Sequence, residues 1–160
     1  MHGGASGVGH FAVQFAKAHG AKVIATASAS NARFLRELGA DEVIDYQSVR
    51  FEDRIKDADV VFDTVGGETL RRSYGIVKRG GYLVTIVDDL DSAALEQRGI
   101  RGSHAVVRAD GGQLAQIARL IDAGKIIPHA SEIFDLASAA AAQDLSQKGR
   151  TRGKIVLRIP

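Results

Sequence analysis

The stretch "GGASGVG" at residues 3–9 has the residue types of a phosphate-binding turn. Glycines let backbone N–H groups approach an anion, and the start of a following helix adds a partial positive charge. Gly4 and Gly9 fit the G-x-G-x-x-G fingerprint, whereas Ser6 stands where the second glycine is expected. The pattern favours pyrophosphate binding, with a ligand-free glycine turn as the alternative. The residues expected at the anion are Ala5, Ser6, Gly7 and Val8.

The elements that must position this turn alternate between helix and strand. Apolar residues at helical spacing predict a helix over 8–19, and apolar, β-branched segments predict buried strands. The predicted strands cover 22–27, 42–46, 59–65, 82–87, 100–107 and 154–159, and the other helices cover 31–40, 68–78, 111–125 and 137–148. This alternation predicts the α/β class, with a doubly wound parallel sheet and helices on both faces.

The composition of the chain limits the classes of protein to which it can belong. The 160 residues are 45% hydrophobic and 25% charged, which predicts one domain over 1–160 with a core of its own. A net charge of +2 gives no field that would attract nucleic acid. The absence of cysteine excludes a disulfide framework and is typical of a reducing, cytoplasmic setting. No apolar run could span a membrane, and the five histidines show no paired spacing for zinc.

Other residues could do chemistry in isolation. The glycines of residues 3–9 also fit a spacing that resembles the short-chain dehydrogenases, which need a tyrosine and a lysine four apart, as Tyr74 and Lys78 are. That pair comes too early in the chain, and Gly75 follows the tyrosine directly, so Tyr74 is expected to pack near the sheet. Asp63 ends a predicted strand, where a carboxylate usually shapes a turn.

A different resemblance covers almost the whole chain. The segments that carry it are "GGASGVGHFAVQFAKAHGAKVIATAS", "LRELGADEVIDY", "VVFDTVGGETL", "VKRGGYLVTI", "LIDAGKIIPHASEIFDLASAAAAQD" and "GRTRGKIVL". Their order and spacing resemble the medium-chain dehydrogenase/reductase superfamily, in its zinc-independent quinone oxidoreductase-like branch. The resemblance implies a Rossmann domain with the strand order 3-2-1-4-5-6, without the first strand and without the N-terminal catalytic domain.

The strand that should precede the glycine turn is therefore expected to be missing between the strands over 22–27 and 59–65. Two rows of buried backbone polar groups would be unsatisfied there, which a domain of this size does not tolerate. Two repairs are open at this point. The segment "KIVLRI" at 154–159 could insert into the gap, or a second copy of the chain could lend a strand.

The cofactor can be argued from the residues after the strand over 22–27. Domains that prefer NAD place a carboxylate there for the ribose 2′-hydroxyl, but residues 27–31 read Ala-Ser-Ala-Ser-Asn. We therefore expect NADP(H) rather than NAD(H), with Ser28 and Arg33 at the 2′-phosphate. The resemblance adds Tyr46 beside the adenine or phosphate. It also implies that the nicotinamide is lined by Thr64, Val65, Gly66, Ile86 and Val87.

The resemblance implies hydride transfer from NADPH to a quinone, an enone or a similar small electron acceptor in the complete enzyme. The chain alone is expected to be nearly inactive, and no catalytic side chain is assigned. A non-catalytic nucleotide-binding or regulatory module and a methyltransferase-like domain are the alternatives. The strand over 100–107 is expected at the edge of the sheet and predicts a homodimer through that edge, as the family also implies.

Overall fold

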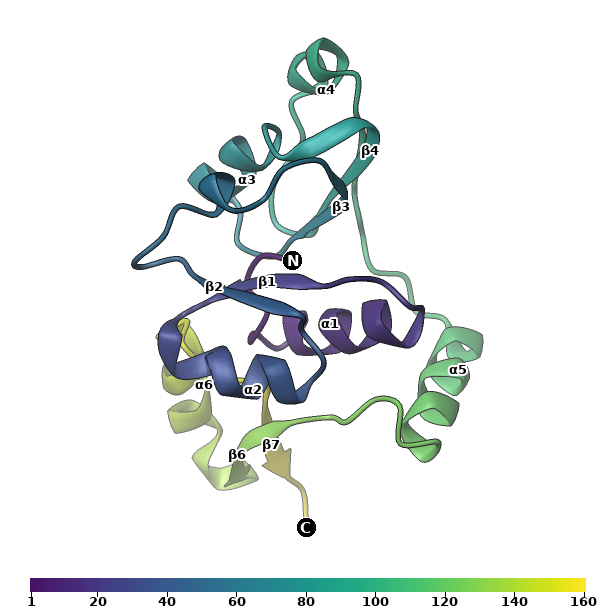
Figure 1. The fold of residues 1–160 in the computed structure, drawn as a ribbon. Coiled ribbons are helices and arrows are strands. Elements are labelled where there is room, and N and C mark those ends of the chain that lie inside the picture. Colours follow the sequence, from purple (N-terminus) through teal and green to yellow (C-terminus); the bar gives the residue numbers. More distant parts are fainter.

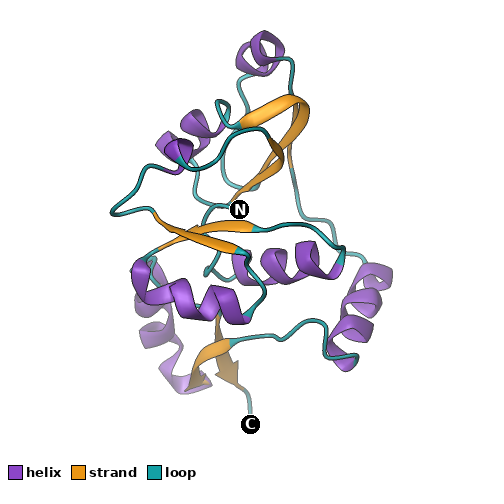
Figure 2. Cartoon of the chain, viewed as in Figure 1, coloured by secondary structure: helices purple, strands orange, loops and turns teal.

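The computed structural model describes residues 1–160 as an α/β fold in which parallel strands alternate with helices (Figure 1, Figure 2). Every strand pairing is parallel, as predicted. The strands form three groups: β1 (Ile24–Ala27) with β2 (Glu42–Asp45), then β3 (Ala58–Asp63), β4 (Val77–Thr85) and β5 (Arg101–His104), and finally β6 (Ala130–Asp135) with β7 (Lys154–Arg158).

The helices differ from the predicted ones mainly at their ends. They are α1 (Gly9–Ala18), α2 (Ala32–Glu37), α3 (Gly67–Ser73), α4 (Ser92–Arg98), α5 (Gly111–Asp122) and α6 (Ala139–Gln147). The predicted helix over 68–78 is wrong after Ser73, because Ile76 and Val77 are buried in the core at the start of β4. The edge strand is shorter than predicted and ends at His104. The sequence analysis did not predict α4 and β6.

Residues 1–4 occupy the position of the missing first strand. The N–H of Thr26 donates to Met1 O (2.9 Å), and the N–H of His2 donates to Phe62 O (3.0 Å). These bonds join β1 to β3, so the spatial order is β2, β1, residues 1–4, β3, β4, β5, and the N-terminus lies between β1 and β3 in Figure 1. The prediction that "KIVLRI" fills the gap is wrong. That segment is β7, and its backbone pairs with β6 instead.

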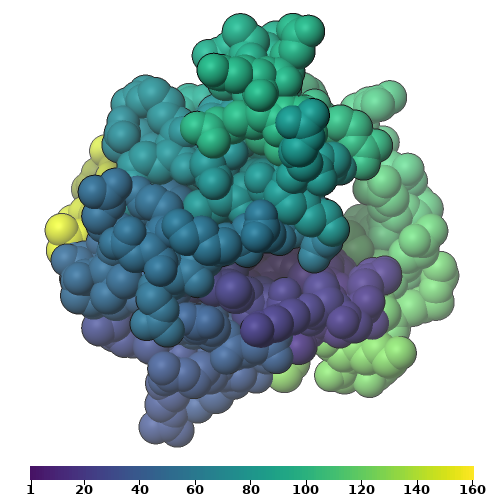
Figure 3. Space-filling model, turned by 45° about the horizontal axis from the view of Figure 1, so that its top comes forward, coloured from purple at the N-terminus to yellow at the C-terminus, as the bar shows by residue number.

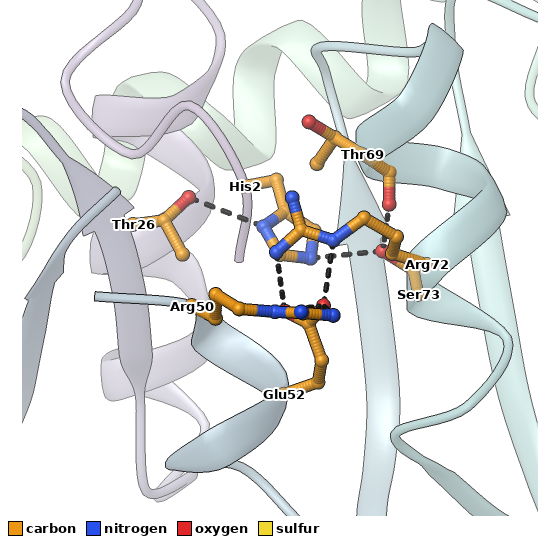
Figure 4. A network of polar contacts seen from close by, with 7 residues as sticks. All are labelled: His2, Thr26, Arg50, Glu52, Thr69, Arg72 and Ser73. Carbon is orange, nitrogen blue, oxygen red and sulfur yellow. Dashed lines mark hydrogen bonds and ion pairs between the residues drawn. The ribbon is translucent and has the colours of Figure 1, made fainter. Parts of the chain in front are cut away.

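A buried polar network fixes His2 beneath this junction (Figure 4). Its Nδ1 lies 3.1 Å from Thr26 Oγ1, and its Nε2 lies 3.0 Å from Ser73 Oγ. Ser73 Oγ donates to Thr69 O, so His2 Nε2 donates to Ser73 and Nδ1 accepts from Thr26. Burial is the main cause that lowers the pKa of His2 to about 3. The imidazole is therefore neutral and ties β1 to α3.

An ion pair covers the same junction. Arg72 Nε donates to Glu52 Oε1 (2.6 Å), and Arg50 pairs with the same carboxylate. The Arg72 guanidinium, which also lies over the ring of Phe51, is the main cause that lowers the pKa of Glu52 to about 2. The Phe51 ring in turn contacts the His2 ring, with centroids 4.5 Å apart.

Two apolar clusters form the core. One packs around β3, β4 and α3 and contains Ile44, Phe51, Ile55, Val61, Leu70, Tyr74, Ile76, Val77, Leu83 and Ile100. The other packs α1 and α2 against β1 and contains Ala5, Val13, Val23, Ala25, Ala27, Phe34, Leu35 and Ala40. After residue 104 only Ile126, Ala142 and Gly153 are buried. None of the helices has the length and apolar composition needed to cross a bilayer.

Candidate dinucleotide-binding site

The glycine loop (residues 3–8) leads into α1, and two glycines at its ends leave no room for a side chain. Gly3 has φ +66°, and a β-carbon on it would lie 2.5 Å from Thr64 Oγ1. A β-carbon on Gly9 would lie 2.1 Å from Gly3 O. Ser6, at the position of the second fingerprint glycine, accepts the N–H of Gly9 through its hydroxyl (3.0 Å). The serine therefore caps the start of the helix.

Two backbone N–H groups of the glycine loop are free to donate hydrogen bonds to an anion. The N–H groups of Gly7 and Val8 make no hydrogen bond within the protein, and the first turn of α1 contains no acidic residue. Ala5 is buried, and its carbonyl accepts the N–H of Gly153 (2.9 Å). Free N–H groups at a helix N-terminus are the feature that binds phosphate groups in dinucleotide folds. Of the residues predicted at the anion, Gly7 and Val8 thus offer free backbone donors, whereas Ala5 is buried.

A cleft of about 360 Å³ lies in front of the glycine loop. Ser6 and Gly7 form one side of it, and the opposite side comes from residues 146–155, more than a hundred positions later in the chain. Thr151 Oγ1 is the one buried side-chain polar atom without a hydrogen-bond partner. The sequence analysis did not find this side, because no local pattern indicates that the chain returns to the loop.

The predicted 2′-phosphate residues lie at the carboxyl ends of β1 and β2. Ser28 is half-buried, and its hydroxyl accepts from Asn31 Nδ2 (3.1 Å). The exposed Tyr46 donates its N–H to Ala27 O (3.2 Å), which places it beside the same turn. Arg33 is 91% exposed and pairs with Glu37 of its own helix (2.8 Å). Its guanidinium is thus already bound to a carboxylate.

A second arginine reaches this turn from the C-terminal part. Arg152 Nε donates to Asn31 Oδ1 (2.8 Å), and Nη2 donates to Ser30 O (3.1 Å). The guanidinium also lies over the ring of Phe34, 5.2 Å from its centroid. No carboxylate pairs with it. The sequence analysis missed this residue.

The predicted nicotinamide residues lie at the carboxyl ends of β3 and β4. Thr64 Oγ1 donates to His2 O (2.9 Å), so the turn after β3 is bonded to the residue before the glycine loop. Gly66 has φ +76°, and a β-carbon on it would lie 3.0 Å from the Val87 side chain. Val65 and Val87 are 54% and 45% exposed, and Ile86 is half-buried. These residues form an apolar surface on the same edge as the loop.

Asp63 has the structural role predicted for it. Its carboxylate accepts the N–H of Val65 (3.1 Å) and of Gly66 (2.9 Å), so it caps the turn after β3. Burial raises the pKa of this carboxyl above its ordinary value. Tyr74 is buried in the core, as expected, and its hydroxyl accepts the N–H of Asp91 (2.8 Å).

Lys78, the other member of the tyrosine and lysine spacing, pairs at the surface with Asp59. It therefore takes no part in a site with Tyr74. No group of three or more His, Asp and Glu side chains is arranged to hold a metal ion.

Comparisons with known proteins agree with this geometry. Residues 38–157 match the zinc-binding dehydrogenase family. The chain is 30% identical to the mitochondrial NAD(P)H oxidoreductase RTN4IP1 of Danio rerio, over 98% of its own length and 48% of that protein. It therefore spans about half the length of the relatives it matches.

Solved structures give the same result. The quinone oxidoreductase from Coxiella burnetii superimposes with a TM-score of 0.93 at 34% identity, covering 99% of this chain and 51% of that one. The Escherichia coli quinone oxidoreductase complexed with NADPH has a TM-score of 0.86 at 28% identity, covering 99% and 56%. These matches favour an oxidoreductase over a regulatory or methyltransferase-like module. The chain belongs to the zinc-binding dehydrogenase family of the medium-chain dehydrogenase/reductase superfamily, and its quinone oxidoreductase-like fold is that of a domain that binds a nicotinamide cofactor.

Proposed function

We propose that this domain binds NADP(H) and serves hydride transfer from NADPH to a quinone, an enone or a similar electron-poor acceptor. The observation that carries the proposal is the pair of free N–H groups of Gly7 and Val8 at the start of α1. Gly7 lines a cleft beside this helix start, and α/β folds bind dinucleotides at the carboxyl edge of their parallel sheet. The similarity to a quinone oxidoreductase solved with NADPH supports the choice of cofactor.

The roles of the residues follow from their places along that edge. The glycine loop holds the pyrophosphate, while Ser28 and Tyr46 lie beside the adenosine. Residues 64–66 with Ile86 and Val87 form the apolar surface for the nicotinamide, which when bound supplies the hydride. We expect the chain alone to show little turnover, because Val65 and Val87 are exposed and water has free access there.

NADP(H) is favoured over NAD(H) because no carboxylate follows β1. The turn over 28–31 offers hydroxyl, amide and carbonyl groups, and its side chains hydrogen-bond among themselves. A carboxylate there would bind the ribose 2′-hydroxyl of NAD and repel the 2′-phosphate of NADP.

Thermal shift tests the assignment. At a concentration a hundred times the Kd, NADPH stabilises the fold by about 2.7 kcal/mol, which raises the Tm by roughly 5–10 °C. NADH is expected to raise it less, and S-adenosylmethionine not at all. An equal response to all three, or none to NADPH, contradicts the proposal.

A matched pair of glycine variants locates the ligand. A β-carbon on Gly7 would lie 3.2 Å from Gly153 O, so Gly7→Val crowds the cleft and is expected to abolish NADPH binding. Gly111 begins α5 with open space around it, so Gly111→Val is the control at another helix start. NADPH affinity that calorimetry finds unchanged in a folded Gly7→Val variant would place the ligand elsewhere.

The proposed assembly is a homodimer through residues 100–107. The N–H of Ala105 donates to Thr85 O (2.8 Å), so it points into the sheet and the N–H of Val106 points out. Val106 and Val107 are 77% and 92% exposed, which supports an edge that pairs with a second copy. Val106→Pro removes an outward donor and is expected to give monomers in light scattering. A wild-type monomer at high concentration refutes the dimer.

The cytoplasmic location expected from the sequence stays a prediction. The Danio rerio relative carries the word mitochondrial in its name. Fractionation of cells that produce the complete protein would decide between the two compartments.

A further inference from the structure

Backbone hydrogen bonds fix the C-terminal wall (residues 149–155) as one side of the cleft. The N–H of Gly153 donates to Ala5 O (2.9 Å), and the N–H of Lys154 donates to His129 O (2.8 Å). Gly153 has φ +61°, and a β-carbon on it would lie 2.3 Å from His129 O. Only glycine fits this crossing, so the wall has a fixed position opposite the glycine loop.

Two groups of the wall face the glycine loop without partners. Lys154 Nζ makes no ion pair or hydrogen bond, and a β-carbon on Gly7 would lie 3.2 Å from it. Thr151 Oγ1 is buried and has no hydrogen-bond partner. An unpaired cation, an unsatisfied hydroxyl and the free N–H of Gly7 therefore line one cleft, and the free N–H of Val8 follows in the chain. All of these groups can donate a hydrogen bond to an anion.

Arg152 lies between Thr151 and Gly153 in the wall, and its side chain contacts the turn after β1. Its donors bond to Asn31 and Ser30, both uncharged acceptors, which hold the guanidinium in place without neutralising it. Arg33, the arginine expected there, is 91% exposed and pairs with Glu37 of its own helix. The ribose 2′-position of a bound dinucleotide lies at the end of this strand in dinucleotide-binding folds.

We infer that the C-terminal wall supplies the side-chain donors of the dinucleotide site, with the cation of Lys154 and the hydroxyl of Thr151 for the pyrophosphate and the cation of Arg152 for the 2′-phosphate. This inference rests on the proposed binding of NADP(H). It makes Arg152, rather than Arg33, the residue that distinguishes NADPH from NADH.

Calorimetry with NADPH and NADH tests each cation separately. Lys154→Gln is expected to weaken both ligands equally, by about tenfold to a hundredfold, because both contain a pyrophosphate. Arg152→Gln is expected to weaken NADPH by a similar factor and to leave NADH unchanged. Arg152→Lys keeps the charge and should restore part of the loss. Arg33→Gln should change neither ligand.

The matched control is Arg150→Gln. Arg150 is an exposed arginine of the same wall without a hydrogen bond or ion pair, so its loss measures the effect of net charge alone. If the wild type binds neither dinucleotide, the proposed function itself fails. If the wild type binds both and the Lys154 and Arg152 variants match Arg150→Gln, the wall is not the anion site. An equal loss of NADPH and NADH in Arg152→Gln also overturns its assignment to the 2′-phosphate.

Discussion

The two parts of the chain differ in what holds them together. Residues 1–104 contain both apolar clusters, whereas after residue 104 only three residues are buried. Figure 3 shows purple residues of the N-terminal part at the surface, with green residues of the C-terminal part beside them. The contacts between the parts include the rings of Phe34 and His129, whose centroids lie 4.7 Å apart, and several hydrogen bonds. Gln14 exchanges two hydrogen bonds with the backbone of Ile127, and Arg152 bonds to Asn31.

This difference bears on the candidate site. The glycine loop belongs to residues 1–104 and is anchored there, because Ala5 is in a core cluster. The opposite side of the cleft belongs to the C-terminal part, after residue 104. A hydrogen bond adds a net ~1 kcal/mol, so a few such bonds hold the C-terminal part less firmly than burial holds a core. A ligand that contacts both sides of the cleft adds to that attachment. If the proposed dinucleotide contacts both sides of the cleft, its binding is expected to hold the C-terminal part more firmly in place.

The largest expected effect is a difference in unfolding free energy between a substitution in residues 1–104 and one in the C-terminal part. Leu83→Ala removes a fully buried side chain from β4 and is expected to lower the free energy of unfolding by about 2–5 kcal/mol. Leu114→Ala, on the exposed helix α5, is expected to change it by about 0.5 kcal/mol or less. Urea denaturation of both variants measures the contrast. Equal losses would mean that α5 is packed against the rest of the chain.

A second prediction concerns acid. Because the pKa of His2 is lowered to about 3 in the fold, the unfolded chain takes up this proton first as the pH falls below 6.5. The contribution of His2 to the free energy of unfolding is fully present above pH 6.5 and is lost at ~1.4 kcal/mol per pH unit down to about pH 3.

Asp63 opposes this loss of stability. Its pKa is raised in the folded state, so the folded protein binds this proton more tightly than the unfolded chain does as the pH falls. The free energy of unfolding should therefore be measured between pH 7 and 4 in wild type and in His2→Gln. The variant is expected to show the flatter profile. NMR should show no titration of the His2 ring above pH 5, and a midpoint near pH 6.5 would contradict its neutral, buried state.

The sequence predicted most elements of both parts, including α5 and α6, but not the partner of the last strand. The segments of β1 and β3 are rich in apolar and β-branched residues, and the alternation of strands with helices predicted parallel pairing, whereas the strand order was implied by the family resemblance. "KIVLRI" has the same composition, yet β7 is largely exposed and pairs with β6, because composition gives the preference for a strand but not its partner. Arg152 could not be found from the sequence for a similar reason. Its contact with Asn31 joins residues 121 positions apart.

The third prediction weakens the polar contact between the parts. Gln14→Met removes both hydrogen bonds to Ile127 and leaves its backbone groups without partners, at a cost of about 1–3 kcal/mol. Amide exchange is expected to accelerate by about tenfold to a hundredfold around residues 126–129 and to stay unchanged in β4. Gln113→Met, on exposed α5, is the matched control. Uniform acceleration across both parts would show that they unfold as one unit.

The smallest expected effect on stability is that of replacing Thr151. This substitution tests whether the hydroxyl contributes to dinucleotide binding or to the stability of the fold. Its buried hydroxyl has no partner, so Thr151→Val removes an unsatisfied polar atom while keeping the shape of the side chain. The Tm without ligand should therefore stay the same or rise slightly. If the hydroxyl donates to a bound pyrophosphate, the same variant should bind NADPH and NADH several-fold more weakly. Thr151→Ser keeps the hydroxyl and should retain affinity. A lower Tm in Thr151→Val with unchanged affinity for both dinucleotides would mean that the hydroxyl serves the fold, and the cleft would lose its donor opposite Gly7.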